Sequence, residues 1–179
     1  MKKLVIYIPS IESGGVEKNL FYISDYLLKK NIDLYVVTAN RNKKKFFNNK
    51  IKFISPKNNK WNNSTRLMKT LICLSLFLKT PTIRNTPVFS FQSNISAIII
   101  SKILGLKVII RLNTSTEKYI DSQIKKIIFN FFYSMSDKII VNSLKFKKNL
   151  KKTLKLNSVL IYNPIKIENK KKVLIKYFL

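Results

Sequence analysis

Short runs of apolar, mostly β-branched residues recur along the chain, and polar residues bound each of them. Runs with little polar alternation are typical of strands that are buried on both faces, and such strands usually pair in parallel. We therefore predict strands at residues 4–8, 34–38, 51–54, 87–91, 107–110, 138–141 and 158–162.

The segments between these runs carry apolar residues at helical spacing. In the first of them Val16, Leu20, Ile23 and Leu27 share one face. Gly105 follows the third segment, in the position where a glycine commonly ends a helix. Strands that alternate with helices predict an α/β fold: a doubly wound, mainly parallel Rossmann-like sheet with helices on both faces. The predicted helices are 15–30, 64–79, 93–104, 119–135 and 143–152.

The chain has 35 Lys and Arg against 8 Asp and Glu, a formal net charge of +27. This excess favours an anionic partner, which could be nucleic acid, a membrane surface or a phosphorylated substrate. A second interpretation stays open, because nearly all of the excess is lysine, and Lys, Asn and Ile share A/T-rich codons. A genome with biased base composition would raise the frequency of all three residues without selection for binding. Arginine, which is scarce here, is the better bidentate phosphate ligand. The four arginines are Arg41, Arg66, Arg84 and Arg111.

The reactive side chains in the sequence exclude several kinds of catalytic and metal-binding site. Cys73 is the only cysteine and histidine is absent, which excludes disulfide frameworks, zinc clusters and histidine general bases. The apolar runs at 4–8 and 71–78 are too short for a secretory signal core or a bilayer span. We therefore expect a cytoplasmic location, and the positive charge suits peripheral contact with the anionic inner face of the membrane.

Two of the three glycines, Gly14 and Gly15, stand together in the turn between the first predicted strand and helix. Glycines there can supply unusual backbone angles, or let an anion approach the N–H groups at the helix N-terminus. ESGGVEK matches neither a dinucleotide nor an ATP phosphate-loop motif, and a tight turn without a ligand stays the alternative. Ligands of doubly wound sheets bind beyond the carboxyl ends of the strands, which places residues 11–16, 92–94 and 111–117 along one crevice.

Two long stretches resemble a known enzyme family. Residues 6–38, IYIPSIESGGVEKNLFYISDYLLKKNIDLYVVT, are similar to the opening of the family-four glycosyltransferases of the GT-B fold. SMSDKIIVNSLKFKKNLKKTLKL, followed by VLIYNPI, resembles a later signature of the same amino-terminal half. Enzymes of this family build bacterial polysaccharides and lipid-linked glycans, and the resemblance covers most of the chain.

The resemblance implies roles for individual residues. Gly14 and Gly15 would approach the donor diphosphate or the acceptor, and Arg111 and Asn113 would act on the acceptor side. The alternative for Arg111 is an exposed cation at a strand end. The donor would be a nucleotide-sugar used as a co-substrate, and we expect no metal.

The same resemblance assigns structural roles to three residues, and this sequence departs from the family pattern at two positions. Asp137 would fix the turn before the strand at 138–141, and Asn163 and Pro164 would form a hinge at the domain boundary. We assign no catalytic residue, because the crevice histidine of many relatives has no counterpart here. Leu144 stands where many relatives carry an acidic residue.

We interpret residues 1–168 as the acceptor-side Rossmann-like domain of a retaining glycosyltransferase, which moves a sugar to a polysaccharide or lipid-linked glycan. Residues 169–179 resemble the start of a C-terminal donor-binding domain, which a separate chain could supply. We therefore expect this truncated chain to be inactive by itself. The alternative is a basic module for nucleic acid or an anionic membrane, supported by the charge and by Phe46, Phe47 and Trp61 among lysines. We expect no specific nucleic-acid partner.

Overall fold

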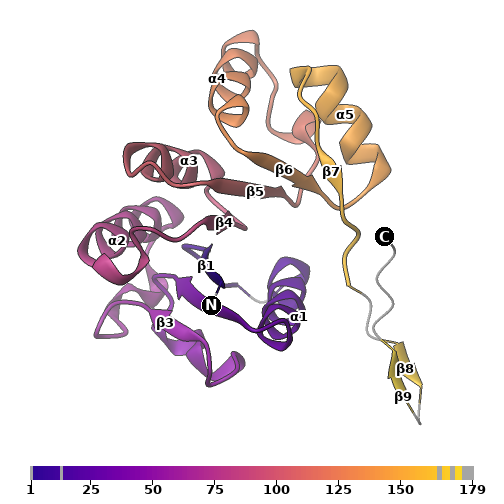
Figure 1. The fold of residues 1–179 in the computed structure, drawn as a ribbon. Helices are drawn as coiled ribbons and strands as arrows, with labels where there is room; N and C mark the ends of the chain where they lie inside the picture. Colours follow the sequence, from indigo (N-terminus) through magenta and orange to yellow (C-terminus); the bar gives the residue numbers. More distant parts are fainter. Residues whose placement is uncertain (1, 13, 165–166, 170–171, 175–179) are drawn as a thin grey trace.

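The computed structural model describes residues 2–12, 14–164, 167–169 and 172–174 (Figure 1). Its main sheet has seven strands, all paired in parallel, in the order β3-β2-β1-β4-β5-β6-β7. The strands are β1 Lys2–Tyr7, β2 Ile32–Val37, β3 Lys52–Ile54, β4 Val88–Ser90, β5 Val108–Leu112, β6 Lys138–Val141 and β7 Val159–Leu160. The helices are α1 Gly15–Lys29, α2 Arg66–Lys79, α3 Asn94–Ile103, α4 Gln123–Ser134 and α5 Leu144–Leu154, with short 3₁₀ turns at Arg41–Phe46, Lys60–Asn63, Pro81–Ile83 and Thr116–Lys118.

The predicted fold class and the alternation of strands and helices are confirmed. The largest difference concerns α4, which begins at Gln123 and not at residue 119. Residues Thr116–Lys118 form a 3₁₀ turn, and the Ser122 hydroxyl then accepts the Lys125 backbone N–H at 3.3 Å and caps α4. A capping serine of this kind sets a helix start that apolar spacing alone does not reveal.

The strand order reverses between β1 and β4, and this reversal puts the helices on both faces of the sheet (Figure 1). Helix α1 packs on one face, where Leu20 joins a core with Ile6 and Ile8. The other four helices cover the opposite face, where β1 contributes Val5 and Tyr7. Neighbouring residues of β1 therefore enter two separate cores, as the alternation of a strand requires.

The end of α3 confirms the prediction made for Gly105, whose φ is +65°. The Gly105 N–H donates to the Lys102 carbonyl at 3.2 Å, and the Leu106 N–H donates to the Ser101 carbonyl at 2.7 Å. This pair of bonds is a Schellman motif, which satisfies the last carbonyls of a helix through a left-handed glycine.

Beyond β7, residues Ile167–Asn169 (β8) and Lys172–Leu174 (β9) pair with each other as an antiparallel hairpin and form a second sheet. The expected boundary after residue 168 falls within β8. Residues 170, 171 and 175–179 of the expected second domain lie outside the described residues, and the boundary stays a prediction. None of the described helices combines the length and the hydropathy that crossing a bilayer needs.

Asp137 has the structural role expected of it. Its Oδ2 accepts the Val108 backbone N–H at 2.7 Å and the Lys102 ammonium at 3.3 Å, so it joins β5, α3 and the start of β6. Partial burial opposes ionisation, but the hydrogen bonds from Val108 and Lys102 outweigh it and lower the pKa of the Asp137 carboxyl.

We predict that Asp137→Ala lowers the free energy of unfolding by about 1–3 kcal/mol, because the Val108 N–H loses a charged acceptor. Because the folded-state pKa is depressed, this contribution is present above the ordinary aspartate pKa and is lost as the pH falls through the folded-state value. Denaturant melts at neutral and acid pH measure it. Asp25→Ala, at an exposed position of α1, is the matched control and should change stability by less than about 0.5 kcal/mol. Equal losses in both variants would contradict the role assigned to Asp137.

Candidate functional site

A cleft of about 750 Å³ opens at the carboxyl edge of the sheet, where the strand order reverses between β1 and β4. The loop after β1, the start of α3 and the end of β5 line it, as expected for ligand sites in doubly wound sheets. One end is polar and contains Arg111, Asn113 and Asn94. The other end lies between α3 and α4 and is apolar and aromatic, with Ile95, Ile99, Tyr119, Phe129 and Tyr133.

The guanidinium of Arg111 is buried in the polar end, with a residue exposure of 1%. Its Nε donates to Asn113 Oδ1 at 3.1 Å, its Nη2 donates to Asn163 Oδ1 at 2.6 Å, and its Cζ lies 5.8 Å from the centre of the Phe91 ring. No carboxylate of the described residues forms an ion pair with it. The interpretation of Arg111 as an exposed strand-end cation is therefore wrong.

Burial lowers the pKa of Arg111, because removing the guanidinium from water penalises its charged form. Buried charges in proteins are normally paired with an opposite charge or bound to an ion. Here the only described side-chain acceptors are neutral amide oxygens, which leaves the positive charge uncompensated beside an open cleft. The arrangement therefore suits an anionic ligand group.

Amide side chains fix the backbone around this arginine. Asn94 Nδ2 donates to the Arg111 carbonyl at 3.1 Å, while Asn94 Oδ1 accepts from the Ser90 hydroxyl at 2.7 Å. Asn113 Nδ2 donates to the Phe91 carbonyl at 2.8 Å. These bonds link the ends of β4 and β5 to the start of α3, so the position of Arg111 is set by three elements at once. Burial also raises the pKa of Tyr133 in the apolar end, so its hydroxyl stays protonated.

Gly14 and Gly15 line a different hollow, of about 490 Å³, together with Lys18, Phe21 and Lys43. The fold therefore does not put the two glycines in the same pocket as Arg111 and Asn113, although Val16, the next residue, lines the main cleft.

Unusual backbone angles are not the reason for this glycine pair, because Gly105 is the only glycine with a positive φ. Gly14 is extended, with φ −154° and ψ −174°, a conformation open to any residue. What Gly14 provides is room, since a Cβ there would lie 3.0 Å from Glu17 Oε2. The buried Glu17 carboxylate in turn accepts the Glu12 backbone N–H at 3.2 Å. At Gly15 a Cβ would meet nothing within 4 Å.

Several polar residues of the site could not be found from motifs. Asn163 was expected to serve only as a hinge, yet it contacts Arg111. On α2, Lys69 is buried and donates from Nζ to Ser10 Oγ at 3.3 Å, and burial lowers the pKa of its ammonium. Arg66 holds Glu12 of the glycine turn by two bonds of 3.0 and 2.8 Å, which lowers the pKa of that carboxyl. No group of three His, Cys, Asp or Glu side chains within the described ranges could hold a metal ion, and a metal-free reaction stays a prediction.

No family model matches the sequence, and no curated protein matches it. Solved structures do match: HepE of Anabaena in complex with UDP-glucose has a TM-score of 0.64 at 14% identity, over 93% of this chain and 45% of HepE. The chain has the fold of one half of a GT-B glycosyltransferase. A glycosyltransferase of Rickettsia africae ESF-5 aligns with this GT-B half at TM-score 0.64 and 16% identity, over 92% and 44% of the two chains. The lipopolysaccharide outer core galactosyltransferase WaaB does so at TM-score 0.60 and 15% identity, over 94% and 47%.

The GT-B half thus spans less than half the length of each of these proteins, and identities this low establish the fold alone. The fold expected from the family resemblance is confirmed. The four predicted site residues have not been tested by these comparisons, and Gly14, Gly15, Arg111 and Asn113 stay candidates.

We predict that Arg111→Met keeps the GT-B half folded and strongly reduces its stabilisation by pyrophosphate. Loss of two hydrogen bonds is offset by removal of a buried, unpaired charge, so the free energy of unfolding should change by less than about 1 kcal/mol. Pyrophosphate at about 100 times its Kd should stabilise the native chain by about 2.7 kcal/mol, measured as a shift in melting temperature.

Arg84→Met is the matched control, because Arg84 is exposed and donates to the Leu78 carbonyl away from the cleft. It should retain the full pyrophosphate effect. The same shift in Arg111→Met as in the native chain would mean that surface lysines, and not this cleft, bind the anion.

Proposed function

We propose that this chain is the amino-terminal, acceptor-side half of a retaining glycosyltransferase that takes a sugar from a nucleotide-sugar donor. The observation that carries the proposal is the buried Arg111 guanidinium, which has no carboxylate partner among the described residues and lies at the switch-point cleft of a GT-B half. HepE, which shares the fold, has been seen with UDP-glucose, and this supports a nucleotide-sugar donor here.

In the proposed reaction the bond from the sugar C1 to the donor diphosphate breaks, and the diphosphate leaves with the electron pair. A hydroxyl of the acceptor forms the new bond to C1, and its proton passes to the departing diphosphate. Groups that stabilise a departing or neighbouring phosphate act mainly by preorganised electrostatics. Arg111 would supply a fixed positive charge, and Asn113 and Asn163 would hold it in place because they accept from Nε and Nη2.

The acceptor in this proposal is a polysaccharide or a lipid-linked glycan, and the shape of the cleft favours the latter. The polar end at Arg111 continues into an apolar end formed by Ile95, Ile99 and Phe129. A molecule with a phosphate beside an aliphatic segment would satisfy both ends, whereas a polar glycan chain would leave the apolar end uncovered. The remaining donor contacts would come from a second half, which a separate chain could provide.

We predict that the purified chain transfers no sugar from UDP-linked donors to lipid-phosphate acceptors. Most of the electrostatic stabilisation of the leaving diphosphate would come from the second half of the GT-B cleft. The measurement is transfer of radiolabelled sugar, with a complete two-domain glycosyltransferase as the positive control. Donor-dependent turnover by the isolated chain would contradict the proposal that it is one half of the enzyme.

We predict that Gly15→Val weakens the binding of UDP or pyrophosphate without unfolding the domain. A Cβ at residue 15 meets nothing within 4 Å, so the fold can accept it, but it would obstruct an anion approaching the N-terminus of α1. Isothermal titration calorimetry on the folded variant measures the loss.

Gly105→Ala is a control expected to change stability and not affinity, the reverse of Gly15→Val. It should lower stability by about 1 kcal/mol, because φ at residue 105 is +65°, and should leave the affinity unchanged. An unchanged affinity in Gly15→Val would leave the glycine pair with a purely structural role.

A further inference from the structure

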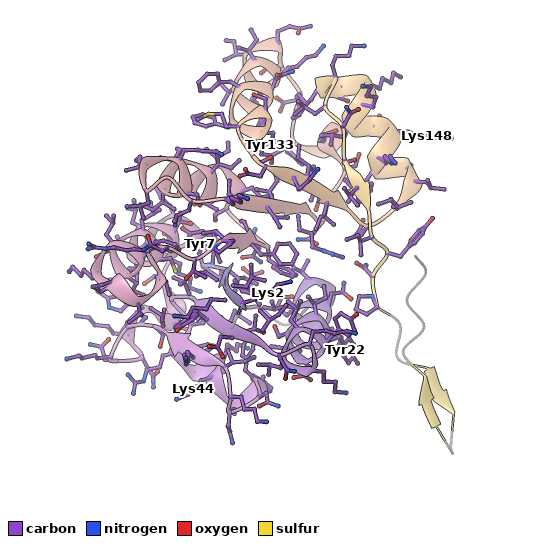
Figure 2. The ribbon with its side chains drawn as sticks, viewed as in Figure 1. Lys2, Tyr7, Tyr22, Lys44, Tyr133 and Lys148 are labelled. Carbon is purple, nitrogen blue, oxygen red and sulfur yellow. The ribbon has the colours of Figure 1, made fainter. Side chains whose placement is uncertain are left out.

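The outer surface of α4 is apolar although it faces away from the core. Ile124, Ile127, Ile128 and Phe131, here called the α4 stripe, are 71%, 69%, 43% and 61% exposed. They recur at i, i+3, i+4 and i+7 and so lie on one side of the helix. Tyr133, on the opposite side, is 4% exposed and belongs to the core, and Figure 2 shows it directed from α4 toward the sheet.

Helix α5 packs beside α4 (Figure 1). Its exposed residues include a row of lysines. Lys145, Lys148 and Lys152, the α5 lysine row, recur at i, i+3 and i+7, opposite the buried Leu150 and Leu154. Figure 2 shows Lys148 on the outside of α5. None of the three forms an ion pair within the described ranges.

The charged side chains of the helices on this face have one sign. The four helices that cover this face, α2 to α5, contain no Asp or Glu, whereas α1 on the other face contains Glu17 and Asp25. Exposed apolar side chains also continue onto α3, which packs against α4 and carries Ile103 at 71% exposure. Acids near this face lie in the segments beside the helices: Asp121, just before α4, pairs with Lys125 at 2.9 Å, and Glu117 accepts from Asn149 of α5 at 2.8 Å.

We propose that the α4 stripe is a membrane-docking surface: it enters the interface of an anionic bilayer while the α5 lysine row contacts the lipid headgroups. An apolar row beside a basic row is the pattern of helices that lie in the plane of a membrane interface. A second copy of this chain fits less well, because it would bring two lysine rows together. Nucleic acid fits less well too, because four exposed aliphatic and aromatic side chains match no phosphate. The inference needs neither donor nor acceptor and stands independently of the proposed function.

The first test is sedimentation of the full chain with vesicles of phosphatidylcholine, with and without phosphatidylglycerol. Ile127→Gln/Phe131→Gln should lower the partition coefficient onto anionic vesicles by about 100-fold, because two apolar side chains no longer enter the interface. Leu67→Gln/Leu71→Gln on α2 is the matched control, since these residues are 71% and 52% exposed, and it should bind like the native chain. Equal losses in both pairs would overturn the assignment to α4.

The second test separates insertion from adsorption. Trp61 is the only tryptophan, so Trp61→Phe/Phe131→Trp places a single fluorophore in the α4 stripe. We expect its emission to shift to the blue on anionic vesicles and to be quenched by lipids brominated in their acyl chains. Binding without either change would overturn insertion.

The third test concerns the lysines and the competing occupant. Lys145→Gln/Lys148→Gln/Lys152→Gln should lower binding to anionic vesicles by about 100-fold at low salt, and the difference should shrink at high salt. Analytical ultracentrifugation checks for a dimer. A dimer that Ile127→Gln/Phe131→Gln dissociates, in a chain that does not bind vesicles, would assign the α4 stripe to self-association and overturn the proposal.

Discussion

Parallel pairing throughout the seven-stranded sheet brings the carboxyl ends of β1, β4 and β5 to a single edge. The reversal of strand order between β1 and β4 sends their following helices to opposite faces, which leaves a gap that no crossover fills. The loop that directly follows β1, the start of α3 and the end of β5 meet around this gap. The cleft is therefore a consequence of topology, and its chemistry depends on the side chains that the strand ends carry into it.

Arg111 makes the cleft suitable for an anion. It carries the same charge as each of the many surface lysines, but it is buried and they are exposed. A surface lysine keeps its water and is screened by salt, so its attraction to an anion is weak and nonspecific. A guanidinium that the fold largely removes from water is screened much less, so its field acts more strongly on an anion that enters the cleft. Its neutral partners, Asn113 and Asn163, orient it without cancelling its charge. The net charge of +27 therefore says less about a specific ligand than one buried cation does.

The outer helix layer distributes the remaining charge unevenly. Acidic residues lie in α1, in loops and in or beside strands, while helices α2 to α5 contain no Asp or Glu and carry lysines together with exposed apolar residues. The apolar end of the cleft lies between α3 and α4, and the α4 stripe lies on the outside of the same helix. A membrane at α4 would thus be next to the end of the cleft that suits an aliphatic segment, so the two proposals, tested separately, agree in geometry.

The sequence by itself determined the elements that depend on local physics. Apolar runs defined the strands, helical spacing defined the helices, and Gly105 marked the end of α3, because each signal lies within a few residues of its effect. Family resemblance also selected Arg111 and Asn113. The tertiary structure alone decided that Arg111 is buried, that Asn163 contacts it across 52 positions, and that Gly14 and Gly15 line a separate hollow. It also decided which apolar face of α4 is covered, since Tyr133 and Ile124 belong to equally plausible stripes until the sheet packs against one of them. Helical spacing shows that a face is apolar, but only long-range packing determines whether that face is withdrawn from water.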